Sequence, residues 1–143
     1  MQKFIIFWGE KGSNGKTVFI ELLRNLLEEK KYYATLSGDA LFKSTAKISS
    51  GSATPHLVPL WGSRIAILDE SDKQVKLNEG MVKRISGSTS LTVRKLFEEE
   101  FTFENCCQTI LVTNYRPEIS NDSALHRRLI LFPFDAQFKS ENE

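Results

Sequence analysis

A glycine-bearing stretch near the start of the chain contains the residue types that bind phosphate groups. It follows the apolar run 4–7 and precedes an amphipathic segment that begins at Val18. In a turn between a strand and a helix, backbone N–H groups converge on phosphate oxygens, and the helix dipole adds to the attraction. Lys16 would reach the β- and γ-phosphates of a nucleotide, and the Thr17 hydroxyl would bind Mg²⁺. The predicted phosphate-binding residues are Gly12, Ser13, Asn14, Gly15, Lys16 and Thr17.

This phosphate loop departs from the usual spacing. Such loops normally have about four residues between their two glycines, whereas five residues separate Gly9 from Gly15. Gly12 lies between them, so we expect the turn to absorb one extra residue near Glu10. The alternative is a surface turn that merely ends in Gly-Lys-Thr. The strand and helix predicted on its two sides favour the phosphate loop.

Two adjacent carboxylates form the second group with evident chemistry. Asp69 and Glu70 follow the apolar run 65–68, which is typical of a strand buried on both faces of a parallel sheet. Open α/β sheets bind ligands at the carboxyl ends of their strands. Asp69 would hold Mg²⁺ through water, and Glu70 would act as a general base toward the attacking water. The alternative is an acidic loop after a core strand, which the phosphate loop upstream makes less probable.

A neutral amide and a pair of arginines flank two further apolar strands. Asn114 follows the run 108–113, where its amide could bind the γ-phosphate or orient water without adding charge; its alternative role is to form a turn. Arg127 and Arg128 precede the apolar run 129–134. The alternative role for these arginines is a surface salt bridge.

The elements that must position these residues alternate between strands and helices. We expect a first strand at 4–7, a helix from residue 15 or 16 to about Lys30, a β-prone segment at 32–36 and a short helix through 41–42. A long loop at 43–59 precedes the strand that ends in the carboxylates. Then follow a helix at 77–87, a hairpin with strands at 91–96 and 101–103 around Glu98–Glu100, and strands at 108–113 and 129–134.

Composition limits the classes of protein to consider. The 143 residues suit one α/β domain covering 1–143, and the formal net charge of +1 indicates that any contact with nucleic acid is local. Cys106 and Cys107 are adjacent and cannot close a loop, which favours a reduced intracellular compartment rather than secretion. No apolar run approaches the ~20 residues of a membrane span, and no signal peptide is evident. We expect the chain to be an excerpt from a longer protein, or a minimal version of one, with a frayed tail at 139–143.

Taken in order, these motifs resemble the superfamily 3 helicases of the AAA+ class, and in particular the poxvirus-type and phage or plasmid primase–helicases. The resemblance covers nearly the whole chain. Residues 12–17 look like the family's phosphate loop and 68–70 like its acidic motif. Residues 83–94 resemble its intervening motif, and 113–117 its sensor motif with Asn114. Arg128 matches the position of the arginine finger, with Arg127 as the second choice.

The resemblance implies a P-loop NTPase fold with five mostly parallel strands in the order 5-1-4-3-2 and a β-hairpin insertion. It implies ATP and Mg²⁺ as cofactors, bound between neighbouring subunits of a ring that is usually hexameric. Arg128 would then contact the γ-phosphate held by the next subunit. Since an arginine supplied in trans contributes roughly 10³–10⁵ in turnover, a monomer is expected to bind ATP and barely hydrolyse it.

The resemblance also implies a nucleic-acid track and further domains. The family's hairpin grips single-stranded DNA in the ring channel, and Lys83, Arg94 and Lys95 are the basic residues in this region. Three consecutive acids, Glu98–Glu100, oppose that charge. A primase domain is expected in the parent chain, and the protein is expected in the cytoplasm or at replication sites of an infected cell.

Three functions are therefore open from the sequence. The first is the ATP-driven motor domain of a viral or phage DNA-replication helicase. The second is a nucleotide-gated module that assembles a ring without unwinding DNA, which the acidic turn favours. The third is another P-loop enzyme such as a small-molecule kinase, for which the expected cluster of arginines is not evident.

Overall fold

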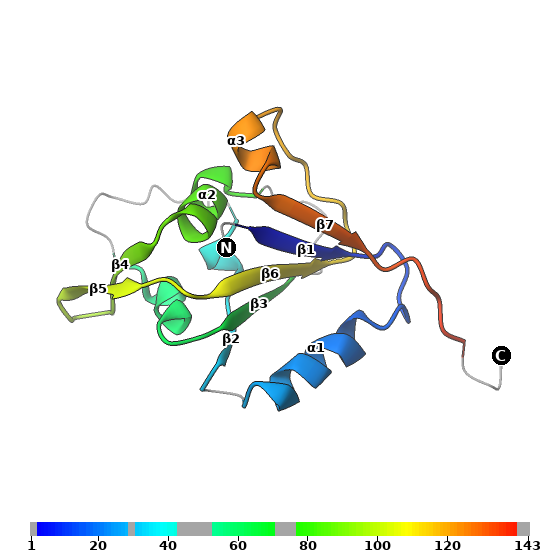
Figure 1. Ribbon diagram of the computed structural model, residues 1–143, viewed down its shortest axis with the longest axis horizontal. Helices are drawn as coiled ribbons and strands as arrows, with labels where there is room; N and C mark the ends of the chain where they lie inside the picture. The colour runs from blue at the N-terminus through cyan, green and yellow to red at the C-terminus, as the bar shows by residue number, and fades with distance from the viewer. Residues whose placement is uncertain (1–2, 29–30, 43–52, 71–76, 140–143) are drawn as a thin grey trace.

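A parallel sheet organises the part of the chain that the computed structural model describes, namely residues 3–28, 31–42, 53–70 and 77–139. Its five strands are β1 (Phe4–Trp8), β2 (Tyr33–Thr35), β3 (Ile65–Glu70), β6 (Gln108–Thr113) and β7 (Leu129–Pro133). They lie in the order β2-β3-β6-β1-β7, and every neighbouring pair is parallel. The α/β class and the mostly parallel five-stranded sheet predicted from sequence are confirmed. All strands point the same way, so the loops that follow them gather at one edge (Figure 1).

The helices divide between the two faces of this sheet. Helix α1 (Lys16–Leu26) covers one face, where Ile20 packs with Phe7 and Ile67. The other face carries α2 (Glu79–Gly87), the 3₁₀ turns η1 (Gly38–Ala40) and η2 (Pro55–Leu60), and, beside α2, the short helix α3 (Ser123–His126). Because alternate residues of a strand face opposite sides, β1 contributes to both layers of the core.

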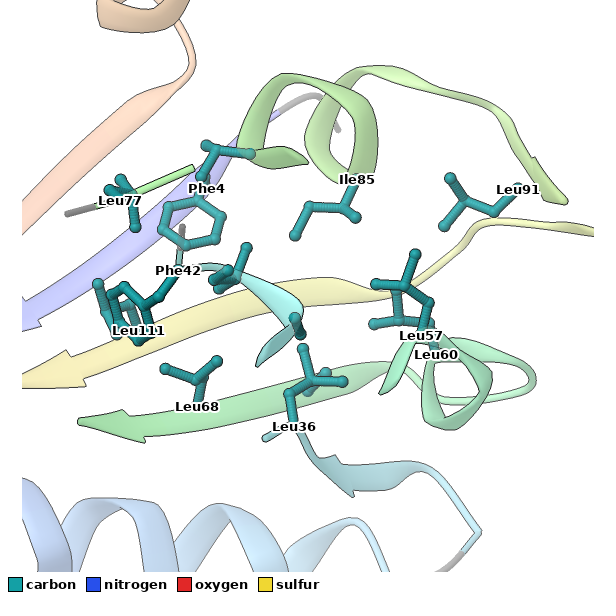
Figure 2. Close-up of a cluster of buried hydrophobic side chains, with 14 of the residues drawn as sticks. Phe4, Leu36, Phe42, Leu57, Leu60, Leu68, Leu77, Ile85, Leu91 and Leu111 are labelled. Carbon is teal, nitrogen blue, oxygen red and sulfur yellow. The ribbon is translucent and has the colours of Figure 1, made fainter. Parts of the chain in front are cut away.

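The larger core cluster lies between the sheet and α2. Figure 2 shows Phe4, Leu68 and Leu111 from three strands pointing into one cluster with Ile85 of α2 and Leu57 of η2. Each of these side chains is at most 2% exposed. Burying an aliphatic or phenyl side chain of this size stabilises the fold by about 1.5–3 kcal/mol, so this layer fixes the strand ends that carry the site.

Three predicted helical or loop segments differ from expectation. Helix α1 ends at Leu26 rather than near Lys30, because Glu28 adopts a left-handed conformation (φ 53°) that a helix cannot continue through. The predicted loop 43–59 contains the 3₁₀ turn η2 in its second half, while residues 43–52 lie outside the described residues. The short helix expected through 41–42 is the 3₁₀ turn Gly38–Ala40.

The hairpin is present, and its turn contains two of the three acids that were expected there, because Glu100 belongs to the second strand. Strands β4 (Ser90–Arg94) and β5 (Glu100–Glu104) pair antiparallel, which places Arg94 opposite Glu100. The turn is therefore 95–99, and Phe97 at its tip is fully exposed with φ 62°. The inward residues of the two strands set this register, because Leu91 and Val93 must face the core together with the phenyl groups of β5.

Candidate nucleotide-binding site

The loop between β1 and α1 takes backbone conformations that suit anion binding. It bends continuously from residue 10 to 15, with Ser13 (φ 55°) and Gly15 (φ 85°) in the left-handed region. Such conformations turn successive N–H groups toward a common concavity, and the loop ends at the N-terminus of α1. Gly12 has open space around its Cα, so the extra residue is accommodated without crowding in the middle of the loop.

Asn14 and Gly9 close the loop against its own backbone. The buried Asn14 side chain donates from Nδ2 to the carbonyl of Lys11 (2.5 Å) and accepts from the backbone N–H of Lys16 (3.5 Å). A Cβ on Gly9 would lie 2.3 Å from Asn14 Nδ2 and 2.8 Å from the carbonyl oxygen of Phe134. No side chain fits at residue 9, so this glycine is required for the close approach.

Lys16 joins the loop to the end of a different strand. Its Nζ donates to the carbonyl of Gly9 and to Oδ1 of Asn114, both at 2.9 Å. Burial lowers the pKa of Lys16, and the nearby charge of Asp69 acts in the opposite direction. The ammonium is thus largely removed from water and lies where three segments of the chain meet.

The turn after β6 holds Asn114 in this position. Thr113 Oγ1 accepts from the N–H of Tyr115 and donates to its carbonyl, both at 3.0 Å, and this closes a tight turn around Asn114. The N–H of Gly9 donates to the carbonyl of Thr113 (3.2 Å), which ties the turn to the phosphate loop. The structure therefore brings Lys16 and Asn114, two of the predicted site residues, into contact.

The carboxylates predicted for metal binding and catalysis end the strand next to β6. Asp69 is level with Val112 and Glu70 with Thr113, so both reach the same edge of the sheet as Asn114. Asp69 is exposed there, and the side chain of Glu70 lies outside the part that the structure describes. Thr17, in the first turn of α1, is exposed. A hydroxyl and a carboxylate are the hard oxygen ligands that Mg²⁺ takes together with phosphates and water, so these residues fit a magnesium–nucleotide.

The two arginines lie at the opposite edge of the sheet. Leu129 of β7 is level with Phe4 at the start of β1, and the carbonyl of Arg128 accepts from the N–H of Phe4 (2.7 Å). The phosphate loop follows the other end of β1. Five residues at about 3.3 Å each separate the two ends by roughly 16 Å, so neither arginine reaches the phosphate loop of its own chain.

The side chains of Arg127 and Arg128 differ in burial and in hydrogen bonding. Arg128 is half-buried, donates from Nη1 to the carbonyl of Ala124 (2.6 Å) and lies against Gly87. Its Nε is buried without a partner. The side chain of Arg127 is exposed, while its carbonyl accepts from Lys3 Nζ (2.6 Å).

The basic residues predicted to grip DNA lie beside carboxylates. Lys83 of α2 forms an ion pair with Asp122 at 2.7 Å. Arg94 lies across the hairpin from Glu100. These placements offset much of the positive charge expected of this region, since opposite charges directly across a hairpin attract.

The third predicted DNA contact, Lys95, lies at the start of the hairpin turn. Its Nζ is 3.2 Å from Glu98 Oε2 and 5.9 Å from the centre of the Phe101 ring. At the tip, Leu96 and Phe97 are exposed. The hairpin turn therefore presents two apolar side chains next to the exposed acids Glu98 and Glu99.

Sequence reasoning missed the contribution of the segment after β7. The N–H of Phe134 donates to the carbonyl of Trp8 (2.7 Å), and that of Phe138 donates to the carbonyl of Ser13 (2.8 Å). The Phe138 ring lies 3.2 Å from where a Cβ on Gly15 would be. Two phenylalanines four residues apart in an otherwise polar tail were the available signal. This segment supports the outer side of the phosphate loop.

Among the residues that the structure describes, no helix is both long enough and apolar enough to cross a membrane.

Comparisons with known proteins find relatives in large DNA viruses. The profile of a family described as "Family of unknown function (DUF5906)" matches residues 7–128. A protein of Acanthamoeba polyphaga mimivirus named "Putative helicase" is 31% identical over 143 residues. That match covers 99% of this chain and 14% of the viral protein.

A second protein with that name, from Frog virus 3 (isolate Goorha), is 30% identical over 144 residues, which is 95% of this chain and 14% of the relative. The chain therefore spans about one seventh of the length of these relatives. Among solved structures, an apo structure of the NrS-1 C terminal region is similar with a TM-score of 0.66 at 18% identity. That likeness covers 94% of this chain and 29% of the other, and it supports the fold.

Proposed function

The chain belongs to the DUF5906 family, and we propose that it is the ATP-hydrolysing motor domain of a viral or phage DNA-replication helicase that works as a ring. The observation that carries this proposal is the position of Lys16, held between the phosphate loop and Asn114 with the charge of Asp69 nearby. The phosphate loop, Asn114 and Asp69 are distant in sequence and meet there. A magnesium–triphosphate needs a cation, a neutral amide and a carboxylate of these kinds. The viral relatives named as putative helicases support the same proposal.

The order of the strands supports a more specific assignment. Counting only the strands of the sheet, β7-β1-β6-β3-β2 has the order 5-1-4-3-2 expected for superfamily 3 helicases of the AAA+ class. The hairpin β4–β5 precedes the strand that carries Asn114, as expected for the same class. We therefore place the chain among the P-loop NTPases of that class.

Each residue of the site has a distinct role in the proposed reaction. Lys16 and the loop N–H groups bind the phosphates, and the Thr17 hydroxyl and Asp69 carboxylate would hold Mg²⁺, which neutralises the charge developing on the phosphates. Glu70 accepts the proton of the attacking water. Asn114 orients the γ-phosphate or that water through its amide.

The missing cationic group comes from a second copy of the chain. Arg127 and Arg128 lie at the edge of the sheet opposite to the phosphate loop, so a ring that joins the two edges brings an arginine of one subunit to the nucleotide of the next. Arg128 is the residue expected from the family pattern. Arg127 has the more exposed side chain and is the second choice.

A second candidate is a nucleotide-gated module that assembles a ring without unwinding DNA. It is favoured by the carboxylates beside all three predicted DNA contacts, which are Lys83, Arg94 and Lys95. We propose a primase domain in the parent chain under the first candidate. The second candidate does not require a primase domain.

ATP hydrolysis, measured over a range of protein concentrations with and without single-stranded DNA, separates these candidates. The motor predicts turnover that rises with assembly and with DNA. Lys16→Ala should abolish nucleotide binding, while Glu70→Gln should retain binding and lose turnover. Arg128→Ala should lose about 10³-fold or more in turnover with binding intact. If single-stranded DNA does not change ATP turnover by the assembled wild-type protein, the motor is contradicted and the assembly module is favoured.

A further inference from the structure

Trp61 has an unusual position for a large aromatic residue. It follows the 3₁₀ turn η2, and its side chain is 58% exposed. One edge of the ring packs on Phe101 of the hairpin, with 5.2 Å between ring centres. Most of the indole surface therefore faces solvent although the residue is fixed in place on both sides, by η2 and by the hairpin.

Two pockets are lined by this residue. A pocket of about 310 Å³ extends from Trp61 toward Lys31 and Tyr33. A second pocket of about 280 Å³ extends from Trp61 past Arg64 toward Phe103. The two share Trp61 and Ser63 in their walls, so both spaces border the tryptophan.

A third pocket continues this series. It has a volume of about 450 Å³, shares Cys106 with the second pocket and reaches Lys3. We call the three together the amino-edge groove, and its walls include Lys31, Trp61, Arg64, Phe103, Cys106 and Lys3. Lys31, Arg64 and Lys3 precede β2, β3 and β1, so the groove follows the amino ends of these strands, opposite to the phosphate loop. Figure 1 shows the hairpin β4–β5 at this same side of the sheet.

The charges along this groove favour an anionic occupant. Its walls contain three cationic side chains, Lys3, Lys31 and Arg64, and the carboxylate of Glu104. Lys3 donates to a backbone carbonyl and so keeps its net charge, whereas Lys31 is paired with Glu28 at 3.2 Å. Within the described ranges, the exposed Arg64 side chain takes part in no ion pair or side-chain hydrogen bond.

We propose that the amino-edge groove binds a segment of single-stranded nucleic acid, with one base stacked on Trp61. Arg64 contacts the nearest phosphate, and Lys3, farther along the groove past Cys106, contacts a later one. Single-strand binding sites combine aromatic platforms with cations that follow the backbone, and this groove has both in that arrangement. The inference rests on the proposed helicase function. It gives the nucleic acid a binding surface other than the hairpin, where Arg94 and Lys95 lie beside carboxylates.

The test is a set of Trp61 and Arg64 variants of the full chain, titrated by anisotropy against a fluorescein-labelled oligothymidylate at low ionic strength. Trp61→Ala should weaken binding about tenfold or more, in the range found for loss of one stacked base. Trp61→Leu, which retains the apolar contact to Phe101, should lose as much. Trp61→Phe should bind nearly as wild type, and Leu26→Ala, an exposed apolar residue on α1, is the matched control.

Two further readouts report the geometry directly. The chain has two tryptophans, Trp8 and Trp61, so oligothymidylate should quench the indole fluorescence of wild type and not that of Trp61→Phe. Arg64→Gln should lower the slope of log affinity against log salt by about 0.7, the value for one phosphate contact on a single strand. Thermal unfolding of each variant checks that the hairpin is still folded.

The possible failures are distinguishable. If Trp61→Ala and Trp61→Leu bind the oligonucleotide as tightly as wild type, the groove is not the binding site, while the helicase proposal stands. If wild type binds magnesium–ATP through Lys16 but no oligonucleotide at low salt, both the groove and the DNA track are wrong.

Discussion

At the scale of single residues, the account depends on what surrounds Lys16. Its ammonium is buried and satisfied by one carbonyl and one neutral amide oxygen, with the carboxylate of Asp69 close enough to act through its charge. Burial lowers the pKa of Lys16, because desolvation disfavours the charged form. A bound triphosphate would supply the anionic partner that this burial lacks, which gives binding an electrostatic gain at this residue.

Two glycines of the same loop provide a matched pair of substitutions. Gly9→Ala should destabilise the chain by about 1–3 kcal/mol, as overpacking does, and should weaken ATP binding, because the new methyl group would meet Asn14 and the carbonyl of Phe134. Gly12→Ala has nothing within 4 Å of the new Cβ and should change neither property much. Chemical denaturation and nucleotide titration of the two variants measure both effects.

Equal effects of the two substitutions would contradict the close packing described for this loop. A Gly9→Ala variant as stable as wild type would show that the front of the loop can move aside.

The sequence was informative for residues that end strands. Lys16 and Asn114 are 98 positions apart, yet each is placed by a buried strand whose end is visible as an apolar run. The contact of Phe138 with Ser13 was not predictable in that way, because nothing periodic connects the tail to the loop. The role of Asn14 as a brace was equally hidden, since only the folded loop shows where its amide lies.

At the scale of elements, the short helix α3 lies between the segment that follows β6 and the arginines. Asp122 caps its N-terminus by accepting from the N–H groups of Ala124 (2.7 Å) and Leu125 (3.3 Å). The same carboxylate pairs with Lys83 of α2. The position of Arg128 therefore depends on a carboxylate with two functions, a helix cap and an inter-helix ion pair.

Asp122 predicts an acid-dependent loss of stability. The hydrogen bond from Lys83, followed by the backbone bond from Ala124, lowers the pKa of Asp122. Its stabilising contribution is present above the unfolded-state pKa of about 3.9 and is lost as the pH falls through the lower folded-state value. Asp122→Asn retains the cap and should flatten this acid dependence, whereas Asp122→Ala should lower the melting temperature at neutral pH as well.

Melting temperatures measured from neutral to acidic pH for the three proteins check this prediction. Parallel curves for wild type and Asp122→Asn would contradict the role of the ion pair. If Asp122→Ala has the same melting temperature as wild type at neutral pH, the role of the cap is contradicted.

The hairpin shows where element prediction reaches its limit. The alternation of apolar residues identified both strands, but the three acids after Phe97 suggested an acidic turn. The register is decided by contacts between strands, in which Thr92 pairs with Thr102 through their hydroxyls at 2.8 Å. This pairing draws Glu100 into β5 and leaves Phe97 at the tip.

At the scale of the whole molecule, the sheet separates two kinds of chemistry. The groups proposed to bind nucleotide follow the carboxyl ends of its strands, while the arginines precede β7 and the groove residues lie at the amino ends. Figure 1 shows the hairpin β4–β5 at the amino-end side of the sheet. A nucleotide bound as proposed would therefore lie far from the arginines of the same copy. The resemblance predicted this separation only through the family's ring, and the structure gives it a geometric reason in the parallel strands.

The central claim is tested most directly by calorimetric titration of magnesium–ATP into the 143-residue chain, with Lys16→Ala and Lys11→Ala beside wild type. Lys11 is an exposed lysine of the same loop and is the matched control. Wild type and Lys11→Ala should bind one nucleotide per chain with similar affinity. Lys16→Ala should bind at least about tenfold more weakly, since hydrogen bonds to charged groups contribute about 1.5–3 kcal/mol. Binding that survives in Lys16→Ala, or that is absent from wild type, would contradict the account.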